Sequence, residues 1–588
     1  MSGNLGTTGL APGATRGTGV SPRAQWTRLR ATAPVSVILL LMTALALAIR
    51  IFTLSRSGYL TGVTEYDDGV YLGGAIRLLQ GALPYHDFAF VQPPGILLLM
   101  TPVALLTKFT TATHAMAAAR ILTALASTAC VPLAGSLVRH RGALVTLVTS
   151  GILAVYPDDI TTAHTLILEP WMNLLLMIGA VLAFRQGRLA SSRRLLWAGV
   201  AIGVATSVKF WAGLPAVVLL VLILAWGEPT WRARGRRAVP YAIGVVIGFC
   251  VPVLPFAVSD PVVFVRSTLL DQATREGSYV PRSLRLAHIT GLIDFLNSEG
   301  HISFTAGTHS LFANGGAAAT SSTSAGWLPY AVTLLAIILV AAGYLLRPVR
   351  LSQLEAFALV TAVLASAAIM VVSEFFYHYP DFGAPWIAIG VGGAFALFSA
   401  PETATQPGTT GPGVAPLASA WRDRVRARLP HDDLVRAQRP VIGILAVALV
   451  LLATFQAREM AGLAAPDIYP DQAAIPAGKC VVTDQVSMAL AADRFTNSPA
   501  GCPDVMDSLA ETLVLSNGVS VQGGATTLPN VVGEWKTIFA KADYVWLSPN
   551  NTRRIPWTPG LTTWFEAHFV KLPVYGGLGA VYERIGDS

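Results

Sequence analysis

The sequence predicts a polytopic α-helical membrane protein that ends in a small α/β domain. Of its 588 residues, 53% are hydrophobic and only 13% are charged. The mean hydropathy is +0.56, which excludes a disordered chain and an ordinary soluble enzyme. The net charge of +8 comes largely from short arginine clusters between apolar runs. Such clusters are typical of cytoplasmic loops, so the basic balance does not indicate nucleic-acid binding.

The N-terminal segment predicts a tail followed by a membrane anchor. Residues 1–25 are rich in Gly, Ser, Thr and Pro, and we expect residues 1–32 to form a disordered cytoplasmic tail. The first apolar run, 33–52, follows Arg28 and Arg30. It contains small residues spaced as in a signal-peptidase site, but they lie inside the apolar core with no polar stretch before them. We therefore expect an uncleaved anchor.

Twelve apolar runs define the membrane region. They fall near residues 33–52, 93–107, 113–137, 142–156, 166–184, 195–208, 210–226, 239–257, 327–346, 351–372, 382–399 and 440–456. If all twelve crossed the membrane, the arginine-rich loops after the third, fifth and seventh runs would lie outside, against the positive-inside rule.

One change in this topology corrects every loop. Residues 93–107 begin with Pro-Pro-Gly and are short for a span of about 20 residues. If this run lies in or on the outer leaflet, all the arginine clusters become cytoplasmic. We therefore predict about 11 transmembrane helices plus interfacial helices in the first outer loop. The N-terminus is then cytoplasmic and the C-terminus lies outside.

This topology gathers charged and aromatic residues from several loops on the outer face. Asp67 and Asp68 follow the first helix, and an amphipathic segment, 70–80, comes next. The other residues placed there are His86, Glu169, Lys209, Gln272, Arg275, Arg282, Arg285, Glu374, Tyr377, His378 and Tyr379. A charge at the centre of a membrane helix costs about 2.5–3.5 kcal/mol, so charged residues near the bilayer require an explanation.

Several of these residues also have a purely structural interpretation. The acidic pair can cap the helix that follows. Glu169 with Pro170 can mark an ordinary helix start. Lys209, which the topology exposes to the outer interface, can extend there without a partner. His378 can belong to an aromatic belt.

The other charged residues of the outer loops have less specific patterns. Arg282 and Arg285 are expected to contact lipid headgroups or acids, and Asp158 and Asp159 to be solvated loop residues. His86 is close in sequence to the acidic pair, but no pattern decides its role.

The last part of the chain changes in composition twice. Residues 400–439 begin rich in Pro, Thr and Gly and end with six arginines, which predicts a cytoplasmic basic linker that contacts lipid. The last transmembrane helix follows at 440–456. Residues 457–588 are far less apolar, and "KCVVTD", "ADYVWLS" and "GAVYERI" resemble strands. We expect a small extracytoplasmic α/β domain there.

The cysteines support an outer location for this domain. Cys480 and Cys502 fall within it, whereas Cys130 and Cys250 lie in predicted helices. An extracytoplasmic domain permits a disulfide, and closing this loop contributes about 3 kcal/mol. We therefore predict that Cys480 pairs with Cys502.

No recognisable cofactor motif is present. The sequence has no zinc-ligand spacing, phosphate loop, nucleophile elbow or dinucleotide fingerprint. The acidic pair with backbone carbonyls can hold a divalent cation, but no ligand set specifies one.

The outer residues match the needs of one reaction class. An enzyme outside the membrane has no nucleotide-sugar supply, so an activated donor must arrive in the bilayer, as a polyprenyl phosphate sugar does. Displacement at the anomeric carbon needs a carboxylate base, here Asp67 or Asp68. It also needs cations, or a metal, at the departing phosphate. The candidates for holding the phosphate are Lys209, Arg275, Arg282, His378 and Tyr379.

The first outer loop resembles a known family. "YDDGVYLGGAIRLLQGALPYHDFAFVQPPG" (66–95) resembles the corresponding loop of GT-C glycosyltransferases, in the branch of protein O-mannosyltransferases and the lipid A aminoarabinose transferase. The resemblance covers residues 33–400 and implies a GT-C fold with a non-crossing helix after the first loop. It places the catalytic acid at Asp67, with Asp68 beside it. Gln92 stands where His is usual, so no general-acid or metal role is carried to that position.

Three later segments extend the resemblance less specifically. "LEPWMNLLL" resembles the second acidic position of the family, at Glu169, where Asp is more frequent. "GVATSVKF" resembles its lysine-bearing turn, at Lys209, and "FFYHYPDFGAPW" its late loop, with His378. Glu169, with His86, is expected near the acceptor or a metal. The C-terminal domain resembles the outer domains of actinobacterial cell-wall members.

We therefore expect an inverting, polyprenyl-phosphate-sugar-dependent hexosyl- or pentosyltransferase at the outer face of the plasma membrane. The donor sugar is mannose or arabinose, and the acceptor a cell-envelope glycan, glycolipid or protein. A transporter or flippase of lipid-linked sugars is the first alternative, but the chain shows no evident internal repeat. A scaffold that displays the outer domain is the second, and it predicts that the acidic pair is replaceable.

Overall fold

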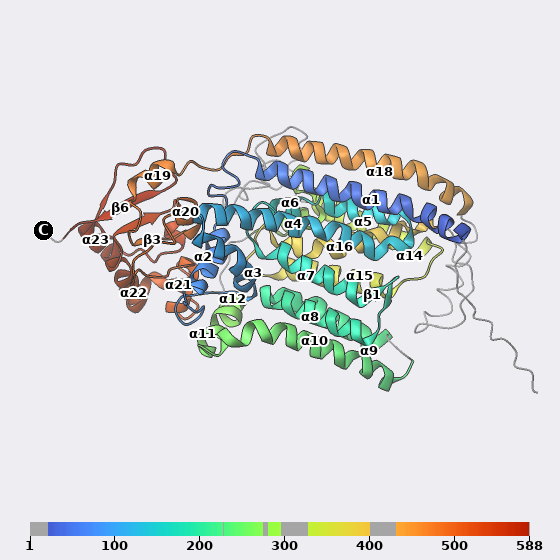
Figure 1. The fold of residues 1–588 in the computed structure, drawn as a ribbon, viewed down its shortest axis with the longest axis horizontal. Helices are drawn as coiled ribbons and strands as arrows, with labels where there is room; N and C mark the ends of the chain where they lie inside the picture. Colours follow the sequence, from blue (N-terminus) through green and yellow to red (C-terminus); the bar gives the residue numbers. More distant parts are fainter. Residues whose placement is uncertain (1–21, 227–228, 275–279, 296–326, 400–430, 587–588) are drawn as a thin grey trace, which may run out of the picture.

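The chain forms a long bundle of helices with a small α/β domain at one end (Figure 1). The structure is a computed structural model that describes residues 22–226, 229–274, 280–295, 327–399 and 431–586. In Figure 1 the bundle helices run roughly along the long axis, and the α/β domain lies at the left.

Every predicted apolar run contains a helix in the described residues. The helices that cover these runs are α1 (Pro22–Leu54), α3 (Gly95–Ala104), α4 (Ala112–Val138), α5 (Ala143–Ala154), α7 (Leu168–Ala183), α8 (Ser192–Val208), α9 (Gly213–Trp226), α10 (Trp231–Ala257), α14 (Leu328–Leu346), α15 (Gln353–Val371), α16 (Ala384–Ala394) and α18 (His431–Met460). The 3-10 turns η1 (Leu105–Lys108), η2 (Arg139–Arg141), η3 (Phe210–Ala212), η6 (Tyr379–Gly383) and η7 (Phe395–Phe398) adjoin them. The connections contain α2 (Asp67–Leu79), α6 (Pro157–Thr162), α11 (Pro261–Val265), the π-helical turn η4 (Arg266–Leu270), α12 (Asp271–Thr274), α13 (Arg282–Thr290), η5 (Leu292–Phe295) and the short strand pair β1 (Phe184–Arg185) and β2 (Arg188–Leu189).

Seven helices of the described residues are long and apolar enough to span a membrane. They include α1, α4, α10, α14, α15 and α18, and the seventh is η6 with α16 and η7. Apolar side chains stay exposed along α10, α14 and α18, as expected of lipid-facing helices: Val246, Val251, Leu334, Ile338, Ile444 and Leu451. The count of about 11 crossings stays a prediction, because α5, α7 and α9 are shorter apolar helices.

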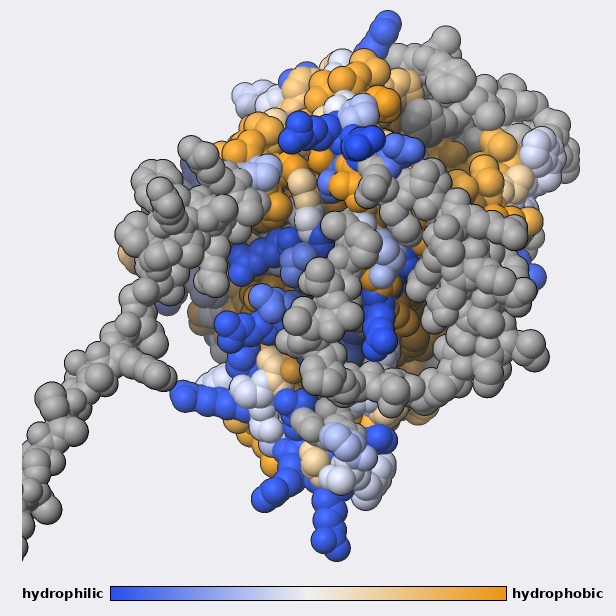
Figure 2. Space-filling model, turned by 90° about the vertical axis from the view of Figure 1, so that its right-hand side faces the viewer, coloured by the Kyte–Doolittle hydropathy of each residue, from blue (hydrophilic) through white to orange (hydrophobic). Residues whose placement is uncertain are grey.

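The two ends of the bundle differ in chemistry. The helices α2 and α3 lie at the same end as the α/β domain (Figure 1). Figure 2 shows the opposite end, where hydrophilic side chains gather beside hydrophobic ones. Among the interhelical contacts is a buried ion network, in which Arg141 Nε and Arg347 Nη2 contact the two carboxylate oxygens of Glu355 at 3.0 and 3.1 Å. The orientation of these ends relative to the membrane stays a prediction.

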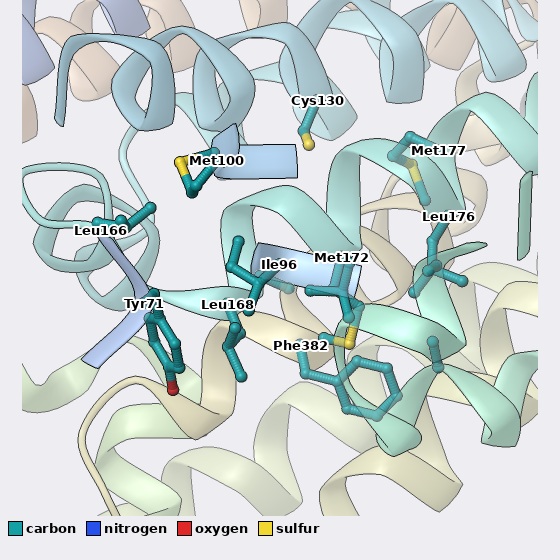
Figure 3. Close-up of a cluster of buried hydrophobic side chains, with 14 of the residues drawn as sticks. Tyr71, Ile96, Met100, Cys130, Leu166, Leu168, Met172, Leu176, Met177 and Phe382 are labelled. Carbon is teal, nitrogen blue, oxygen red and sulfur yellow. The ribbon is translucent and has the colours of Figure 1, made fainter. Parts of the chain in front are cut away.

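The short helix α3 packs against the bundle rather than lying apart from it. Its Ile96, Leu97 and Met100 are fully buried, and α3 contacts α2, α4 and α8. Figure 3 shows Ile96 and Met100 among side chains of α4 and α7. A ten-residue helix is about 15 Å long, which is too short to cross a hydrocarbon core of about 30 Å. This agrees with the non-crossing segment predicted from the arginine loops.

The closest helix crossing, between α8 and α10, depends on glycine. Gly199 and Gly203 face α10, and Gly244 and Gly248 face α8, so the two backbones touch. A Cβ atom at any of the four positions would overlap a carbonyl oxygen of the other helix. Small residues four apart allow this close approach in membrane helices.

The C-terminal domain contains a four-stranded sheet of order β3-β4-β6-β5. Its strands are β3 (Val481–Thr483), β4 (Tyr544–Leu547), β5 (Phe569–Lys571) and β6 (Ala580–Arg584). Its helices are α19 (Tyr469–Ala474), α20 (Val486–Ala491), α21 (Ser508–Leu515), α22 (Pro529–Ala540) and α23 (Pro559–His568), with the turns η8 (Ala525–Thr527) and η9 (Asn551–Arg553). β3 and β4 are parallel, and the other pairs are antiparallel.

Sequence patterns identified three of these four strands and missed β5, which follows directly after helix α23. Cys480 and Cys502 form a disulfide, which is the pairing that the sequence predicts.

Two expectations about the bundle were wrong. Helix α1 begins at Pro22, so residues 22–32 are helical rather than part of a disordered tail; residues 1–21 and the linker residues 400–430 lie outside the described residues. Asp158 and Asp159 are buried, not solvated. Asp159 pairs with Arg50 at 2.9 Å, and Asp158 pairs with His288 at 2.8 Å. Both partners come from distant parts of the chain, so no local sequence pattern indicated the burial.

The glycine crossing leads to a prediction about stability. Gly248→Val should force α8 and α10 apart, and overpacking of this kind costs about 1–3 kcal/mol. Thermal unfolding of the purified protein in detergent measures the effect as a lower Tm. Gly235→Val is the control, because a Cβ at Gly235 on the same helix meets no atom within 4 Å. An equal decrease in Tm in both variants would show that close packing of α8 against α10 does not determine the stability.

Candidate active site

The acidic pair starts helix α2, and its two carboxylates have different surroundings. The N-cap residue of α2 is Tyr66, and the cap has no side-chain hydrogen bond. Asp68 is fully buried. Its Oδ2 lies 2.6 Å from Arg120 Nη2 of α4, and its Oδ1 accepts a hydrogen bond of 2.6 Å from the Leu166 N–H. These partners replace the predicted helix cap.

Arg120 also holds the loop between α1 and α2. It is fully buried and also donates to the Tyr59 carbonyl oxygen at 2.7 Å. A charged arginine in an apolar helix requires a buried partner, and Asp68 is that partner. The start of α2 is therefore held against α4 and the loop before α7.

The Asp67 side chain is partly exposed, and several acidic residues lie near it. Burial raises the pKa of Asp67 well above its usual range, and the charges of Glu65, Asp507 and Glu169 raise this pKa further, while Lys209 opposes them. A carboxylate with a raised pKa is a stronger base. Asp67 thus has the accessibility and the basicity that proton abstraction needs.

Glu169, Lys209 and His378 form one buried triad. Glu169 is the second residue of α7, Lys209 lies at the break between α8 and η3, and His378 precedes η6. Glu169 Oε1 accepts from Lys209 Nζ and lies 2.8 Å from His378 Nδ1. Lys209 Nζ also lies 4.5 Å from the centroid of the Tyr379 ring, which is a cation–π distance.

The triad corrects one expectation and decides between two interpretations. Lys209 is only 5% exposed and is therefore not free to extend to the interface. His378 contacts Glu169 as well as its aromatic neighbours, so it is more than a member of an aromatic belt.

A small cavity of about 90 Å³ lies beside these residues. Its polar lining includes Glu65, whose Oε2 accepts a hydrogen bond of 2.8 Å from the Tyr377 hydroxyl. Tyr59, Thr64 and His164 also line it, with the link between α18 and the C-terminal domain. The Glu65 carboxylate therefore borders a space that a small polar group can enter.

The structure does not bring every predicted residue into this cluster. The side chain of His86 is 59% exposed and pairs with Asp87. Arg282 is exposed at the start of α13. The Arg285 side chain is buried and donates to the carbonyl oxygens of Ile369 and Val372 at 3.0 and 2.6 Å, where α15 ends. Arg275 lies outside the described residues.

Sequence reasoning missed Arg120, Glu65 and Asp507. Arg120 had a detectable signal, because a lone arginine inside an apolar run needs a buried acid. Glu65 is two residues from Asp67. Asp507 is 440 residues away from Asp67 and carries no local signal. Within the described residues, no three His, Cys, Asp or Glu side chains are placed to hold a metal ion.

The different surroundings of the acidic pair lead to a prediction. Asp68→Asn should lower the free energy of unfolding by about 3–5 kcal/mol, since it leaves the buried Arg120 without its charge partner. Asp67→Asn, which removes a carboxylate from an acidic environment, should not lower it. Thermal unfolding of both variants in detergent compares them. If the two variants are equally stable, Asp68 is not the structural anchor.

Comparisons with known proteins concern the family and the fold of the chain. Residues 105–269 match the family model described as dolichyl-phosphate-mannose-protein mannosyltransferase. This segment contains Glu169 and Lys209 but not Asp67. No curated protein matches the chain in sequence.

Solved structures match over nearly the whole chain. ArnT from Cupriavidus metallidurans bound to undecaprenyl phosphate has a TM-score of 0.52 at 15% identity, over 93% of this chain and 98% of that one. The apo state of the same protein has a TM-score of 0.50 at 15% identity, over 96% of this chain and 98% of that one. At this identity the likeness shows the fold, and the family match adds the enzyme class. The chain therefore has the fold of the membrane glycosyltransferase ArnT, and part of it matches a mannosyltransferase family model.

Proposed function

We propose that this glycosyltransferase transfers a sugar, mannose or arabinose, from a polyprenyl phosphate to a hydroxyl group of a cell-envelope glycan, glycolipid or protein. One observation carries the proposal: the partly exposed base Asp67 and the cation Lys209 face one buried acid, Glu169, whose charge acts on Asp67. A displacement at an anomeric carbon needs a base and a cation placed close together.

The donor class is supported by two comparisons. The matching family is described as using dolichyl-phosphate-mannose, and the ArnT structure holds undecaprenyl phosphate. Both donors combine a lipid tail with a phosphate, and the candidate site contains the buried cation Lys209. In this proposal Lys209 and His378 hold the phosphate, with Tyr379 beside them. A lysine ammonium has three N–H donors, of which Glu169 takes one.

The chemistry follows from these positions. The acceptor hydroxyl attacks the anomeric carbon, and Asp67 takes the hydroxyl proton as the new C–O bond forms. The bond from the anomeric carbon to the phosphate oxygen breaks, and the polyprenyl phosphate leaves with the electron pair. Lys209 and His378 stabilise the negative charge that develops on that phosphate. Attack from the face opposite the phosphate inverts the anomeric configuration.

The acceptor approaches from the side of the small cavity in this proposal. Glu65 and the tyrosines there are groups that bind hydroxyls. The cavity borders the α2 start, where the base lies, and the triad lies on α7, η3 and η6. Donor phosphate and acceptor hydroxyl are thereby kept on different sides of Asp67.

A transfer assay tests the proposal. Purified protein in detergent should transfer sugar from polyprenyl-phosphoryl mannose or arabinose to acceptors in envelope extracts, with radiolabelled product as the readout. Asp67→Asn should lose at least about 100-fold of the rate, the lower range for a general base, at wild-type stability. Asp87→Asn, an exposed acid of the same loop, is the control. Transfer by Asp67→Asn at the wild-type rate would show that Asp67 is not the base. If the wild-type protein turns over neither donor, the next experiment measures flipping of lipid-linked sugars across liposomes.

The phosphate site leads to a separate binding prediction. Lys209→Met should weaken undecaprenyl phosphate binding about tenfold or more, because a hydrogen bond to a charged group contributes about 1.5–3 kcal/mol. Lys209→Arg should bind more tightly than Lys209→Met, since it keeps the charge. Microscale thermophoresis measures the Kd values, and Lys541→Met, at an exposed lysine of the outer domain, is the control. An unchanged Kd in Lys209→Met would show that Lys209 does not bind the donor phosphate.

A further inference from the structure

We propose that the C-terminal domain is a working part of the active site, in which Asp507 is a positioning residue that holds Tyr66 and controls the proton on Asp67. This inference rests on the proposed role of Asp67 as the base. It gives the domain a function beyond covering the site or recruiting a partner.

The domain packs directly on helix α2, the helix that begins with Asp67. A Cβ atom at Gly69 would overlap the backbone of Val486 and Ser487 in the domain. Only glycine therefore allows this contact without displacement of the domain. Near the other end of α2, Arg77 pairs with Asp504 at 2.6 Å. The guanidinium group of Arg77 also lies 4.3 Å from the centroid of the Phe495 ring.

Asp507 connects the domain to the residue next to the base. Asp507 Oδ1 accepts a hydrogen bond of 2.8 Å from the Tyr66 hydroxyl. The same oxygen accepts one of 2.9 Å from the Ala510 N–H, which makes Asp507 the N-cap of α21. Asp507 is thus held rigidly by its own helix and in turn holds Tyr66, the N-cap residue of α2.

A second domain residue clamps the same tyrosine. The Arg554 guanidinium lies 4.0 Å from the centroid of the Tyr66 ring. Arg554 Nη1 is held by Asp484 Oδ2 at 2.9 Å, directly after β3. The disulfide links this strand region to the Asp507 segment, since Cys480 precedes β3 and Cys502 precedes Asp507. The disulfide therefore joins the segment that carries Asp507 to the segment that holds Arg554 through Asp484.

The charge of Asp507 acts on Asp67 together with charges from the bundle. The groups that face Asp67 are Glu65 of the same loop, Glu169 of α7, Lys209 at η3 and Asp507 of the domain. Burial has the largest effect on the Asp67 pKa; the three acids raise the pKa, and Lys209 lowers it. Docking of the domain therefore makes Asp67 a stronger base, because it adds a negative charge near the carboxylate.

The test reads the protonation of Asp67 without any donor or acceptor. Dicyclohexylcarbodiimide adds to protonated carboxyl groups, and peptide mass spectrometry with fragment ions separates labelled Asp67 from Asp68. The full chain, purified in detergent, is labelled across a pH series to find the pH of half-maximal labelling. Labelling falls as pH rises through the pKa, and removal of a nearby negative charge lowers that pKa. Asp507→Asn should therefore move the midpoint down by about half a pH unit to one unit.

A matched control separates charge from docking. Asp504→Asn is the same substitution in the same segment, but Asp504 contacts Arg77 rather than Tyr66. It should leave the midpoint at the wild-type pH. Asp507→Ser, whose hydroxyl can still cap α21, should shift the midpoint as Asp507→Asn does, which covers the case in which one variant fails to fold.

The outcomes distinguish this inference from the proposed function. An unchanged midpoint in both Asp507 variants would overturn the inference, as would an equal shift in Asp504→Asn. The loss of transfer in Asp67→Asn is measured separately. If the midpoint shifts but Asp67→Asn still transfers sugar, the charge of Asp507 acts on Asp67 as inferred, but Asp67 is not the catalytic base.

Discussion

The buried ion pair between Asp68 and Arg120 is the constraint on which the candidate site depends. It joins α2 to α4 at 2.6 Å, and the second carboxylate oxygen of Asp68 holds the loop before α7. A buried pair of this kind contributes little net stability, but removal of one partner is costly. Its role here is geometric: it holds the start of α2, where the neighbouring Asp67 experiences the charges of Glu169 and Lys209.

The acidic pair divides into two roles because successive residues on a helix point about 100° apart. One carboxylate can therefore be buried in the bundle while its neighbour stays partly exposed. Asp68 is neutralised by an arginine, whereas Asp67 faces other acids. Two adjacent residues of the same type thus have different surroundings: Asp68 is a structural anchor, and Asp67 is the base in the proposed reaction.

The C-terminal domain packs directly on the helix bundle at α2. Helix α2 is fixed by α4 on one side and by the domain on the other, where Gly69 lets the two backbones touch. The pattern of buried charge is consistent throughout: Arg50 with Asp159, Lys209 with Glu169, and Arg347 with Glu355 each join separate helices or loops. Isolated charges are too costly at such depths, so each pair specifies how its elements meet.

The sequence by itself determined the apolar helices, three of four domain strands and the cysteine pair, whereas the non-crossing of residues 93–107 stays a prediction. These features depend on local composition, on arginine distribution and on residue spacing, which a single sequence displays. The same sequence also contained signals that went unused, such as the glycines four apart at Gly199 and Gly203 and the lone Arg120 in an apolar run.

Only the tertiary structure decided which charges are paired. Asp158 and Asp159 were expected in solvent and Lys209 at the interface, yet all three are buried with partners. Arg120 lies 52 residues from Asp68, and Asp507 lies 441 residues from Tyr66. Such contacts arise from packing between distant segments, so no local pattern encodes them. The physical reason is that burial of a charge depends on the partner that folding brings to it.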